Sequence, residues 1–325
     1  MLLEAERSPV KSRADPAFLA DVLAGLGSRP RAIPARWFYD ERGSQLFEEI
    51  TRLPEYYPTR TETALLRRHG SDITALTGYG RAVVEFGSGS STKTPLLLSA
   101  VQPAAYVPVD ISGDFLRASA ATLGEVFPGL PVMPIEGDFS RPLALPHAIA
   151  NKPCLGFFPG STIGNFVPDE AVDLLRGIAD TLGKGAMLLI GIDRIKSPDI
   201  LIPAYDDPQG VTAAFNLNLL DRINHELEGD IPKAGFVHRA VWNDRAARIE
   251  MHLEALEDLS FVVAGHRFAI ATGETIHTEN SHKYGPRDAA LLLRAGGWTP
   301  LAEWGDAENQ FLMILAEAAP PHIAP

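Results

Sequence analysis

The sequence predicts an α/β fold, in which helices cover both faces of a parallel β-sheet and a second, α+β domain is attached to it. Two observations lead to this prediction. Between residues 63 and 194, short apolar runs alternate with helical patterns, as expected for βαβ units whose strands are buried on both faces. Between residues 195 and 284, the pattern changes to strands of alternating polarity, which is typical of a sheet with one buried face.

The N-terminal segment, residues 1–62, differs in texture from the parallel-sheet region. "PAFLADVLAGLG" has the periodicity of a helix, and "SQLFEEITRL" predicts a second helix with Ser44 as its N-cap. The aromatic-rich stretch over residues 35–62 fits neither a helix nor a strand throughout. From about residue 63, the expected parallel strands follow in the runs "AVVEF", "AYVPVD", "PVMPIEGD", "CLGFFPG" and "AMLLIGIDR".

Residues 195–284 are predicted to interrupt the parallel-sheet domain. "RIEMHLEAL" alternates strictly and predicts a half-buried antiparallel strand, whose buried face carries Ile249, Met251, Leu253 and Ala255. "LSFVVAGHRFAIATGE" predicts two more strands around a Gly-His turn. Residues 285–325 then complete the parallel-sheet domain with two strands, which follow a helix that ends at Gly296 and Gly297.

Composition and charge disfavour several classes of function. The formal net charge of −12 and the pI near 5.2 disfavour a nucleic-acid partner, because an acidic surface repels phosphates. Cys154 is the single cysteine, so no internal disulfide forms, and we expect it to be a core residue in a reducing cytoplasm. No signal sequence and no apolar run of ~20 residues is found. A cytoplasmic protein without a membrane segment is therefore expected.

The glycine-containing loop in "VVEFGSGSSTKTPLLL", residues 83–98, suggests a nucleotide site at first sight. A phosphate-binding P-loop requires a second glycine before the Lys-Thr pair, and a dinucleotide fingerprint requires a third glycine. Both patterns fail at the same residue, Thr92, because a β-branched side chain resists the backbone conformations that wrap a phosphate. The loop therefore favours a ligand without a phosphate group.

An acid before a G-x-G turn remains, formed by Glu85, Gly87 and Gly89. This pattern is the first motif of the S-adenosylmethionine-dependent methyltransferases with a Rossmann-like sheet, and their cofactor carries no phosphate, so that Ser90 and Ser91 are tolerated. Glu85 would accept a hydrogen bond from the amino group of the cofactor. Taken alone, a G-x-G after a strand is often a turn without a function.

Two further acids follow at expected strand ends. Asp110 ends "YVPVD", where a carboxylate can accept from both ribose hydroxyls, although alone it could equally be a helix N-cap. Asp138 in "EGDF" lies where an adenine amino group could bind, with Phe139 beside the ring. Because the carboxyl ends of parallel strands meet at one edge of a sheet, the ordered set favours a methyltransferase.

Motifs outside the cofactor fold make the assignment more specific. "WFYDERGSQLFEEITRLPEYYPTRTE", "FPGSTIGNF", "AYDDPQGVTAAFN" and "IHTENSHKY" resemble the L-histidine Nα-methyltransferases of ergothioneine biosynthesis, also called dimethylhistidine N-methyltransferases. The resemblance covers about residues 30–318. It implies a class I, Rossmann-like methyltransferase sheet, a substrate-binding domain formed by residues 1–62 and 195–284, and transfer of three methyl groups from S-adenosylmethionine to L-histidine, giving hercynine.

The resemblance also implies roles for particular residues. The substrate side would comprise ligands of the α-carboxylate (Asn165, Tyr205), ligands of the imidazole (Tyr56, Glu279, Ser281), residues near the amine (Tyr39, Phe47), residues lining the methyl passage (Gly160, Thr162), and Met251, which by alternation is at least a core residue. The cofactor side would comprise Glu85, Gly87, Ser88, Gly89, Lys93, Asp110, Asp138 and Phe139. Without the resemblance, Tyr56, Asn165 and Glu279 would be taken for a packing aromatic, a turn residue and a solvated acid.

The expected chemistry is an in-line methyl transfer to a neutral amine, with Tyr39 and water as the proton route. Aromatic faces at residues 37–39 and at Phe47 would hold the increasingly methylated nitrogen through cation–π attraction. No metal is expected, because His277 and His282 form no zinc-like set with other ligands. The partners expected are L-histidine and its mono- and dimethylated forms, bound to a monomer. Two alternatives stay open: a related N-methyltransferase for another amino acid or amine, and a non-catalytic cofactor-binding protein.

Overall fold

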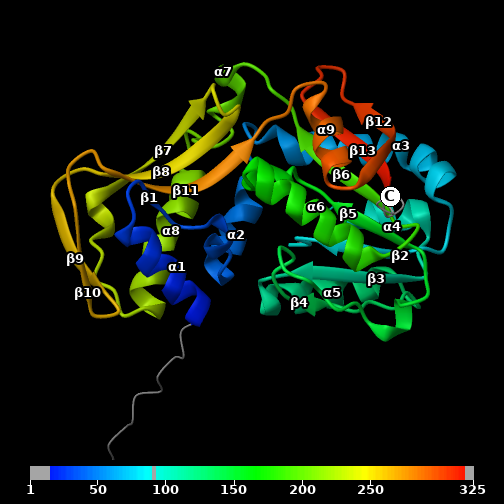
Figure 1. Cartoon of the computed structure of the whole chain (residues 1–325), viewed down its shortest axis with the longest axis horizontal. Coiled ribbons are helices and arrows are strands. Elements are labelled where there is room, and N and C mark those ends of the chain that lie inside the picture. The colour runs from blue at the N-terminus through cyan, green and yellow to red at the C-terminus, as the bar shows by residue number, and fades with distance from the viewer. Residues whose placement is uncertain (1–14, 90–92, 319–325) are drawn as a thin grey trace, which may run out of the picture.

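The computed structural model describes residues 15–89 and 93–318 (Figure 1). Its larger sheet has seven strands in the order β12-β13-β6-β5-β2-β3-β4. The strands β4, β3, β2, β5 and β6 run parallel to one another. β13 runs antiparallel to β6, and β12 runs antiparallel to β13. Their bounds are β2 (Ala82–Phe86), β3 (Ala105–Asp110), β4 (Ile135–Glu136), β5 (Cys154–Phe158), β6 (Met187–Asp193), β12 (Trp298–Gly305) and β13 (Phe311–Ala318). The α/β prediction and the Rossmann-like sheet are confirmed.

Helices cover both faces of this sheet, because successive strand residues point to opposite sides. Val83 packs in one apolar cluster with α3 and α4, and its neighbour Val84 packs in another with α6 and α9. The bounds of these helices and of α5 are α3 (Tyr57–Thr77), α4 (Thr94–Val101), α5 (Gly113–Val126), α6 (Pro168–Leu182) and α9 (Asp288–Ala295). Short 3-10 turns lie at η2 (His147–Ile149) and η3 (Thr162–Asn165).

A smaller, four-stranded sheet has the order β1-β11-β8-β7 (Figure 1). It combines β1 (Arg31–Ala32) with β7 (Phe236–Asn243), β8 (Arg248–Ala255) and β11 (Thr275–His282), next to the hairpin of β9 (Leu259–Val263) and β10 (His266–Ile270). The parallel pairing of β1 with β11 joins the N-terminal segment to the later one. The accompanying helices are α1 (Pro16–Gly27), η1 (Ala35–Phe38), α2 (Glu41–Ile50), α7 (Pro198–Leu201), α8 (Val211–Glu226) and η4 (Lys233–Gly235).

Most local predictions agree with the observed elements. The buried face of β8 is the predicted one, since Ile249, Met251, Leu253 and Ala255 are each at most 1% exposed. The final helix ends at Ala295 with Gly296 as its C-cap, and β12 and β13 follow. Of the run "PVMPIEGD", only Ile135–Glu136 forms a strand. The loop residues 90–92, on which the rejection of the nucleotide patterns depends, lie outside the described residues.

Two predicted details were wrong. Helix α2 begins at Glu41, and its N-cap is Asp40 rather than Ser44, because the Asp40 carboxylate accepts from the Gly43 amide at 2.6 Å. A glycine is needed there, since a Cβ on Gly43 would lie 1.7 Å from the Phe38 carbonyl oxygen. The β9–β10 turn lies one residue earlier than predicted, because His266 already pairs with Val263. The positive φ angles of Ala264 and Gly265 form that turn.

The expected boundary between residues 62 and 63 falls inside the continuous helix α3. The division of the chain into domains at residues 62, 194 and 284 therefore stays a prediction. Among the described residues, no helix is long and apolar enough to cross a membrane.

Candidate active site

A cavity of about 820 Å³ lies at the carboxyl ends of the parallel strands and extends to the smaller sheet. The turns after β2, β3 and β5 line one side, where the strand order reverses about β2, which is the usual ligand position in open α/β sheets. Side chains from η1, α2 and β11 line the other. All predicted site residues except three line this cavity: Tyr39, Phe47, Tyr56, Glu85, Gly87, Ser88, Gly89, Lys93, Asp110, Asp138, Phe139, Gly160, Thr162, Asn165 and Glu279. Tyr205, Met251 and Ser281 lie behind its wall.

The Asp110 carboxylate is fixed to the glycine loop. Its Oδ2 accepts from the Gly89 amide and its Oδ1 accepts from the Ser112 amide, both at 2.9 Å. Gly87 and Gly89 both have positive φ angles, which a glycine adopts without strain. Because Ser112 is the N-cap residue of α5, Asp110 does not fill that position. Burial raises the pKa of Asp110, and the backbone amides partly offset this effect.

Two further carboxylates flank the glycine loop. Glu85 is buried, and its Oε2 accepts from Thr94 Oγ1 at 2.7 Å and from Tyr106 Oη at 2.6 Å. Burial raises the pKa of Glu85 to about 7, although both hydrogen bonds lower it. Asp138 accepts from the Ser140 amide at 2.9 Å. Three acids around one loop favour a ligand that donates hydrogen bonds and disfavour a phosphate.

Arg36 connects the cofactor side to the smaller sheet, and no sequence pattern indicated this role. Its guanidinium contacts Asp138 Oδ2 at 3.1 Å and Asp21 Oδ2 at 2.6 Å. Asp21 also accepts from Trp37 Nε1 at 2.8 Å. The position of Asp138 therefore depends on a residue that precedes it by 102 positions.

Glu62 is a second residue that sequence reasoning missed. It is fully buried, accepts from the Gly160 amide at 2.9 Å and forms an ion pair with Lys93. A Cβ on Gly191 would lie 2.0 Å from Glu62 Oε1, so the glycine in β6 provides the room for this carboxylate. Lys93 thus has a buried partner at the start of α4, and the backbone at Gly160 is held by a side chain of α3.

Aromatic rings form a continuous wall on the substrate side. Tyr39, Phe47 and Tyr56 are linked edge to face, with centroids 5.7 Å apart for Tyr39–Phe47 and 6.2 Å for Phe47–Tyr56. Phe215 of α8, which was not predicted, packs on Tyr39 at 5.8 Å and on Phe47 at 6.0 Å. Burial, followed by the nearby Glu279, raises the pKa of Tyr39 well above 10. The Tyr39 hydroxyl is therefore protonated near neutral pH.

A buried polar network holds Tyr205 and Ser281 behind this wall. Lys283 is fully buried and donates to Tyr205 Oη and Ser281 Oγ at 2.8 Å each, and to Asp193 Oδ2 at 2.7 Å. All three ammonium protons are thus used. Tyr205 and Ser281 also share a hydrogen bond of 2.7 Å. One hydroxyl proton serves that bond, and the other hydroxyl keeps its proton for a further acceptor.

Asp193, at the end of β6, anchors this network. It also accepts from Tyr57 Oη at 2.6 Å and pairs with Lys196 at 2.5 Å. Burial alone would raise the pKa of Asp193, but Lys283 and Lys196 hold it below its usual range. One acid between two lysines leaves a net positive charge, which favours a nearby carboxylate.

A β-bulge at Thr278 decides which way Glu279 points. His277 pairs with His252 across β8, but Glu279 pairs with Met251 and Ser281 with Ile249. Glu279 and Ser281 therefore share a face with the buried side chain of Met251, which is 1% exposed. Thr278 fixes the bulge by donating to Asn216 Oδ1 at 2.8 Å. Burial raises the pKa of Glu279 to about 7, and Lys283 lowers it in part.

Comparisons with known proteins agree with this geometry. Residues 18–318 match the family described as "Histidine-specific methyltransferase, SAM-dependent". The chain is 41% identical over 307 residues to a histidine N-alpha-methyltransferase of Mycolicibacterium smegmatis, covering 92% of this chain and 94% of that one. It is 38% identical over 307 residues to the protein of the same name from Mycobacterium tuberculosis, with the same coverage. It is 32% identical to ergothioneine biosynthesis protein 1 of Neurospora crassa, covering 89% of this chain and 33% of that one.

Proposed function

Because this chain belongs to the family of histidine-specific, S-adenosylmethionine-dependent methyltransferases, we propose that it methylates the α-amino group of L-histidine three times, giving hercynine for ergothioneine biosynthesis. One observation carries the proposal. A single cavity contains a glycine loop flanked by carboxylates and, on its far side, the partly buried acid Glu279 beside an aromatic wall. The first part suits the cofactor, and the second suits an amino acid whose side chain has an N–H group.

The residues around the glycine loop fit S-adenosylmethionine. A Cβ on Gly87 would lie 3.5 Å from the Phe139 ring, so the glycine leaves an open surface next to an aromatic face. Asp110 would accept from the ribose hydroxyls, Asp138 from the adenine amino group, and Glu85 from the amino-acid portion. Bound here, the cofactor supplies an electrophilic methyl group. Gly160 and Thr162 would line the passage through which the amine approaches.

On the substrate side, we assign the carboxylate to Asn165 and Tyr205, and the imidazole to Tyr56, Glu279 and Ser281. The network around Lys283 supports this assignment, because it leaves one hydroxyl donor and a net positive charge near the carboxylate. Met251 lies opposite Glu279 in the sheet and limits the size of the side-chain pocket. Tyr205 and Ser281 do not line the cavity, and we assign them to the ligand through the network that they share with Lys283.

Three successive transfers require a site that tolerates the loss of N–H donors. Tyr39, Phe47 and Tyr56 line the cavity, with Phe215 packed against the first two, and aromatic faces attract a methylated ammonium without hydrogen bonds. Only a neutral amine attacks. Because its raised pKa keeps Tyr39 protonated, we propose that water accepts each proton.

A direct assay tests the proposal. The protein is incubated with S-adenosylmethionine and each of the twenty amino acids, and mass spectrometry follows the products. Histidine should gain three methyl groups, and the other amino acids none. Methylation of a different amino acid would favour the alternative of a related enzyme with another substrate. Cofactor binding without any transfer would favour a non-catalytic protein.

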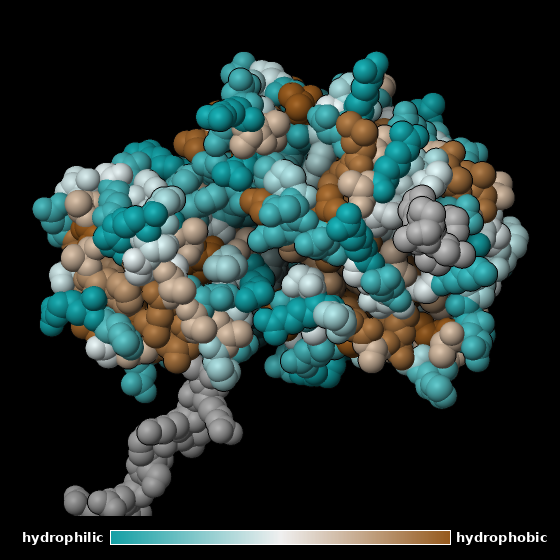
Figure 2. Space-filling view, in the orientation of Figure 1, coloured by the Kyte–Doolittle hydropathy of each residue, from teal (hydrophilic) through white to brown (hydrophobic). Residues whose placement is uncertain are grey.

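We further propose a cytoplasmic monomer. The cysteine Cys154 is buried and free. On the face shown in Figure 2, hydrophilic side chains predominate and the apolar ones are scattered among them, which favours a surface exposed to water. Light scattering at micromolar concentration should give the mass of one chain.

A further inference from the structure

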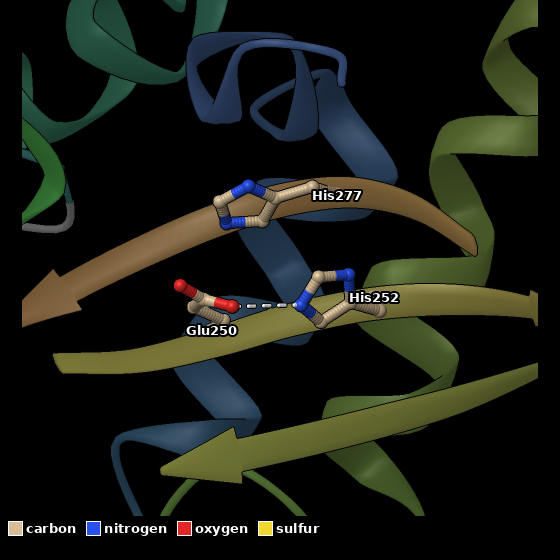
Figure 3. Close-up of side chains that lie close together, drawn as sticks. All are labelled: Glu250, His252 and His277. Atoms are coloured by element: carbon tan, nitrogen blue, oxygen red, sulfur yellow. Dashed lines mark hydrogen bonds and ion pairs between the residues drawn. The ribbon is translucent and has the colours of Figure 1, made fainter. Parts of the chain in front are cut away.

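Glu250, His252 and His277 lie close together on one face of β8 and β11 (Figure 3). The strand register places Glu279 on the opposite face, with Met251. His252 and His277 are direct partners across the two strands, and their rings stack with centroids 4.8 Å apart. Glu250 precedes His252 by two residues on the same face, and its Oε2 lies 3.2 Å from His252 Nε2. One ligand atom from each residue lies within 4.8 Å of the other two.

The surroundings of Glu250 orient its carboxylate toward the histidines. Its Oε1 accepts from Asn243 Nδ2 at 2.8 Å and from Arg248 Nε at 2.7 Å, so that Oε2 is turned to the cluster. Outer hydrogen bonds of this kind fix the direction of a metal-binding carboxylate. Arg248 also opposes a cation by its charge, which limits the affinity.

Both imidazoles present a ring nitrogen to the cluster. His252 Nδ1 is buried and has no hydrogen-bond partner among the described residues, so Nε2 alone makes the polar contact of that ring. Both imidazoles are held on paired strands, and binding therefore requires little rearrangement.

We propose that Glu250, His252 and His277 bind a divalent transition metal of the class of Co²⁺, Ni²⁺ and Zn²⁺. Two imidazoles and a carboxylate suit these ions, whereas Mg²⁺ and Ca²⁺ prefer oxygen ligands throughout. Three protein ligands leave at least one position for water. With the charge of Arg248 nearby, we expect a dissociation constant in the micromolar range.

The site is coupled to the active-site cavity through His277. Its Nε2 shares a hydrogen bond of 2.9 Å with the backbone oxygen of Glu279, and both residues line the cavity. Because a carbonyl oxygen only accepts, Nε2 carries the proton and Nδ1 carries the lone pair that a metal ion would take. A metal ion at Nδ1 would polarise and reposition the ring that makes this hydrogen bond. If the proposed function holds, metal binding should therefore raise the KM for histidine and leave cofactor affinity unchanged.

Binding is tested first without any reference to activity. Calorimetry with Zn²⁺, and visible absorption with Co²⁺, are measured on full-length protein free of a histidine tag. The wild type should bind one equivalent of Zn²⁺ or Co²⁺ and should not bind Mg²⁺. In His252→Ala, the affinity for Zn²⁺ and Co²⁺ should fall at least tenfold. His266→Ala is the matched control, because His266 is exposed on β10. Equal isotherms for wild type and His252→Ala would overturn the site.

The coupling is tested by kinetics. Zn²⁺ should raise the KM for histidine in the wild type and in His266→Ala, a chelator should reverse the effect, and His252→Ala should not respond. Metal binding with an unchanged KM would overturn the coupling through Glu279. If the protein does not methylate histidine at all, the proposed function fails, and the binding measurements still decide the metal site.

Discussion

Glu279 offers the most discriminating test of substrate recognition. Glu279→Ala removes a partly buried carboxylate that we assign to the imidazole N–H. Losing one hydrogen bond to a charged group costs about 1.5–3 kcal/mol, a ten- to hundredfold loss in histidine binding. S-adenosylmethionine should still bind, because its proposed ligands lie across the cavity. Room is also created opposite Met251, so the variant should become relatively more permissive toward phenylalanine and tryptophan.

The assay compares kcat/KM for histidine, phenylalanine and tryptophan in the wild type and in Glu279→Ala. The wild type should reject the apolar side chains strongly, since they would leave the carboxylate unpaired. Calorimetry with the cofactor serves as the control for folding. If the ratio of histidine to tryptophan does not change, Glu279 does not read the imidazole and the reasoning is wrong.

The same residue predicts how stability depends on pH. Burial raises the pKa of Glu279 from 4.5 to about 7, which corresponds to roughly 3 kcal/mol against the ionised form. Below pH 4.5 the acid is protonated in both the folded and the unfolded state, and nothing is lost. Between pH 4.5 and 7 the unfolded state releases its proton while the folded state still holds it, so the free energy of unfolding falls. Relative to Glu279→Gln, the wild type without substrate should therefore lose stability as the pH rises from 5 to 8, measured by urea unfolding. A constant difference would refute the raised pKa.

Three further outcomes are expected. Asp110→Ala should weaken cofactor binding at least a hundredfold in calorimetry, because two charge-assisted hydrogen bonds at about 1.5–3 kcal/mol each are lost; unchanged affinity would remove Asp110 from the site. Lys283→Met should raise the KM for histidine at least tenfold with little change in cofactor affinity. Lys196→Met should not raise it, because Lys196 lacks contacts to Tyr205 and Ser281. Equal effects of the two variants would mean that Lys283 is merely structural. Activity should rise from pH 6 to 9 as the substrate amine deprotonates, and a flat profile with rate-limiting chemistry would indicate a base within the cavity.

The parallel strands and the glycine loop could be predicted because their signals are local. A buried strand such as Ala82–Phe86 is a continuous apolar run, and the turn after it needs glycines with positive φ. The start of α2 could not be located in the same way. Asp40 and Ser44 are both good N-caps, and the close approach of Gly43 to Phe38 decides between them.

The buried partners of the site residues could not be predicted, because the interactions join distant positions. Glu62 and Lys93 are 31 residues apart, Arg36 and Asp138 are 102 apart, and Tyr205 and Lys283 are 78 apart. A charged residue in a single sequence is ordinarily taken to be solvated. The bulge at Thr278 was equally hidden, since regular alternation would place His277 and Glu279 on one face.

Two of these long-range contacts join the cofactor side of the cavity to its substrate side. Asp193 ends a strand of the cofactor sheet and holds Lys283, which in turn holds Tyr205 and Ser281 of the substrate side. Arg36 reaches from the substrate side to Asp138 in the same manner. Removing one partner of the buried pair Asp193–Lys283 strongly destabilises the fold, and the partly exposed pair Arg36–Asp138 is a weaker link. Both links hold the spacing between the two halves of the cavity. In-line methyl transfer depends on that spacing to within a fraction of an ångström, and residues that touch neither ligand therefore control it.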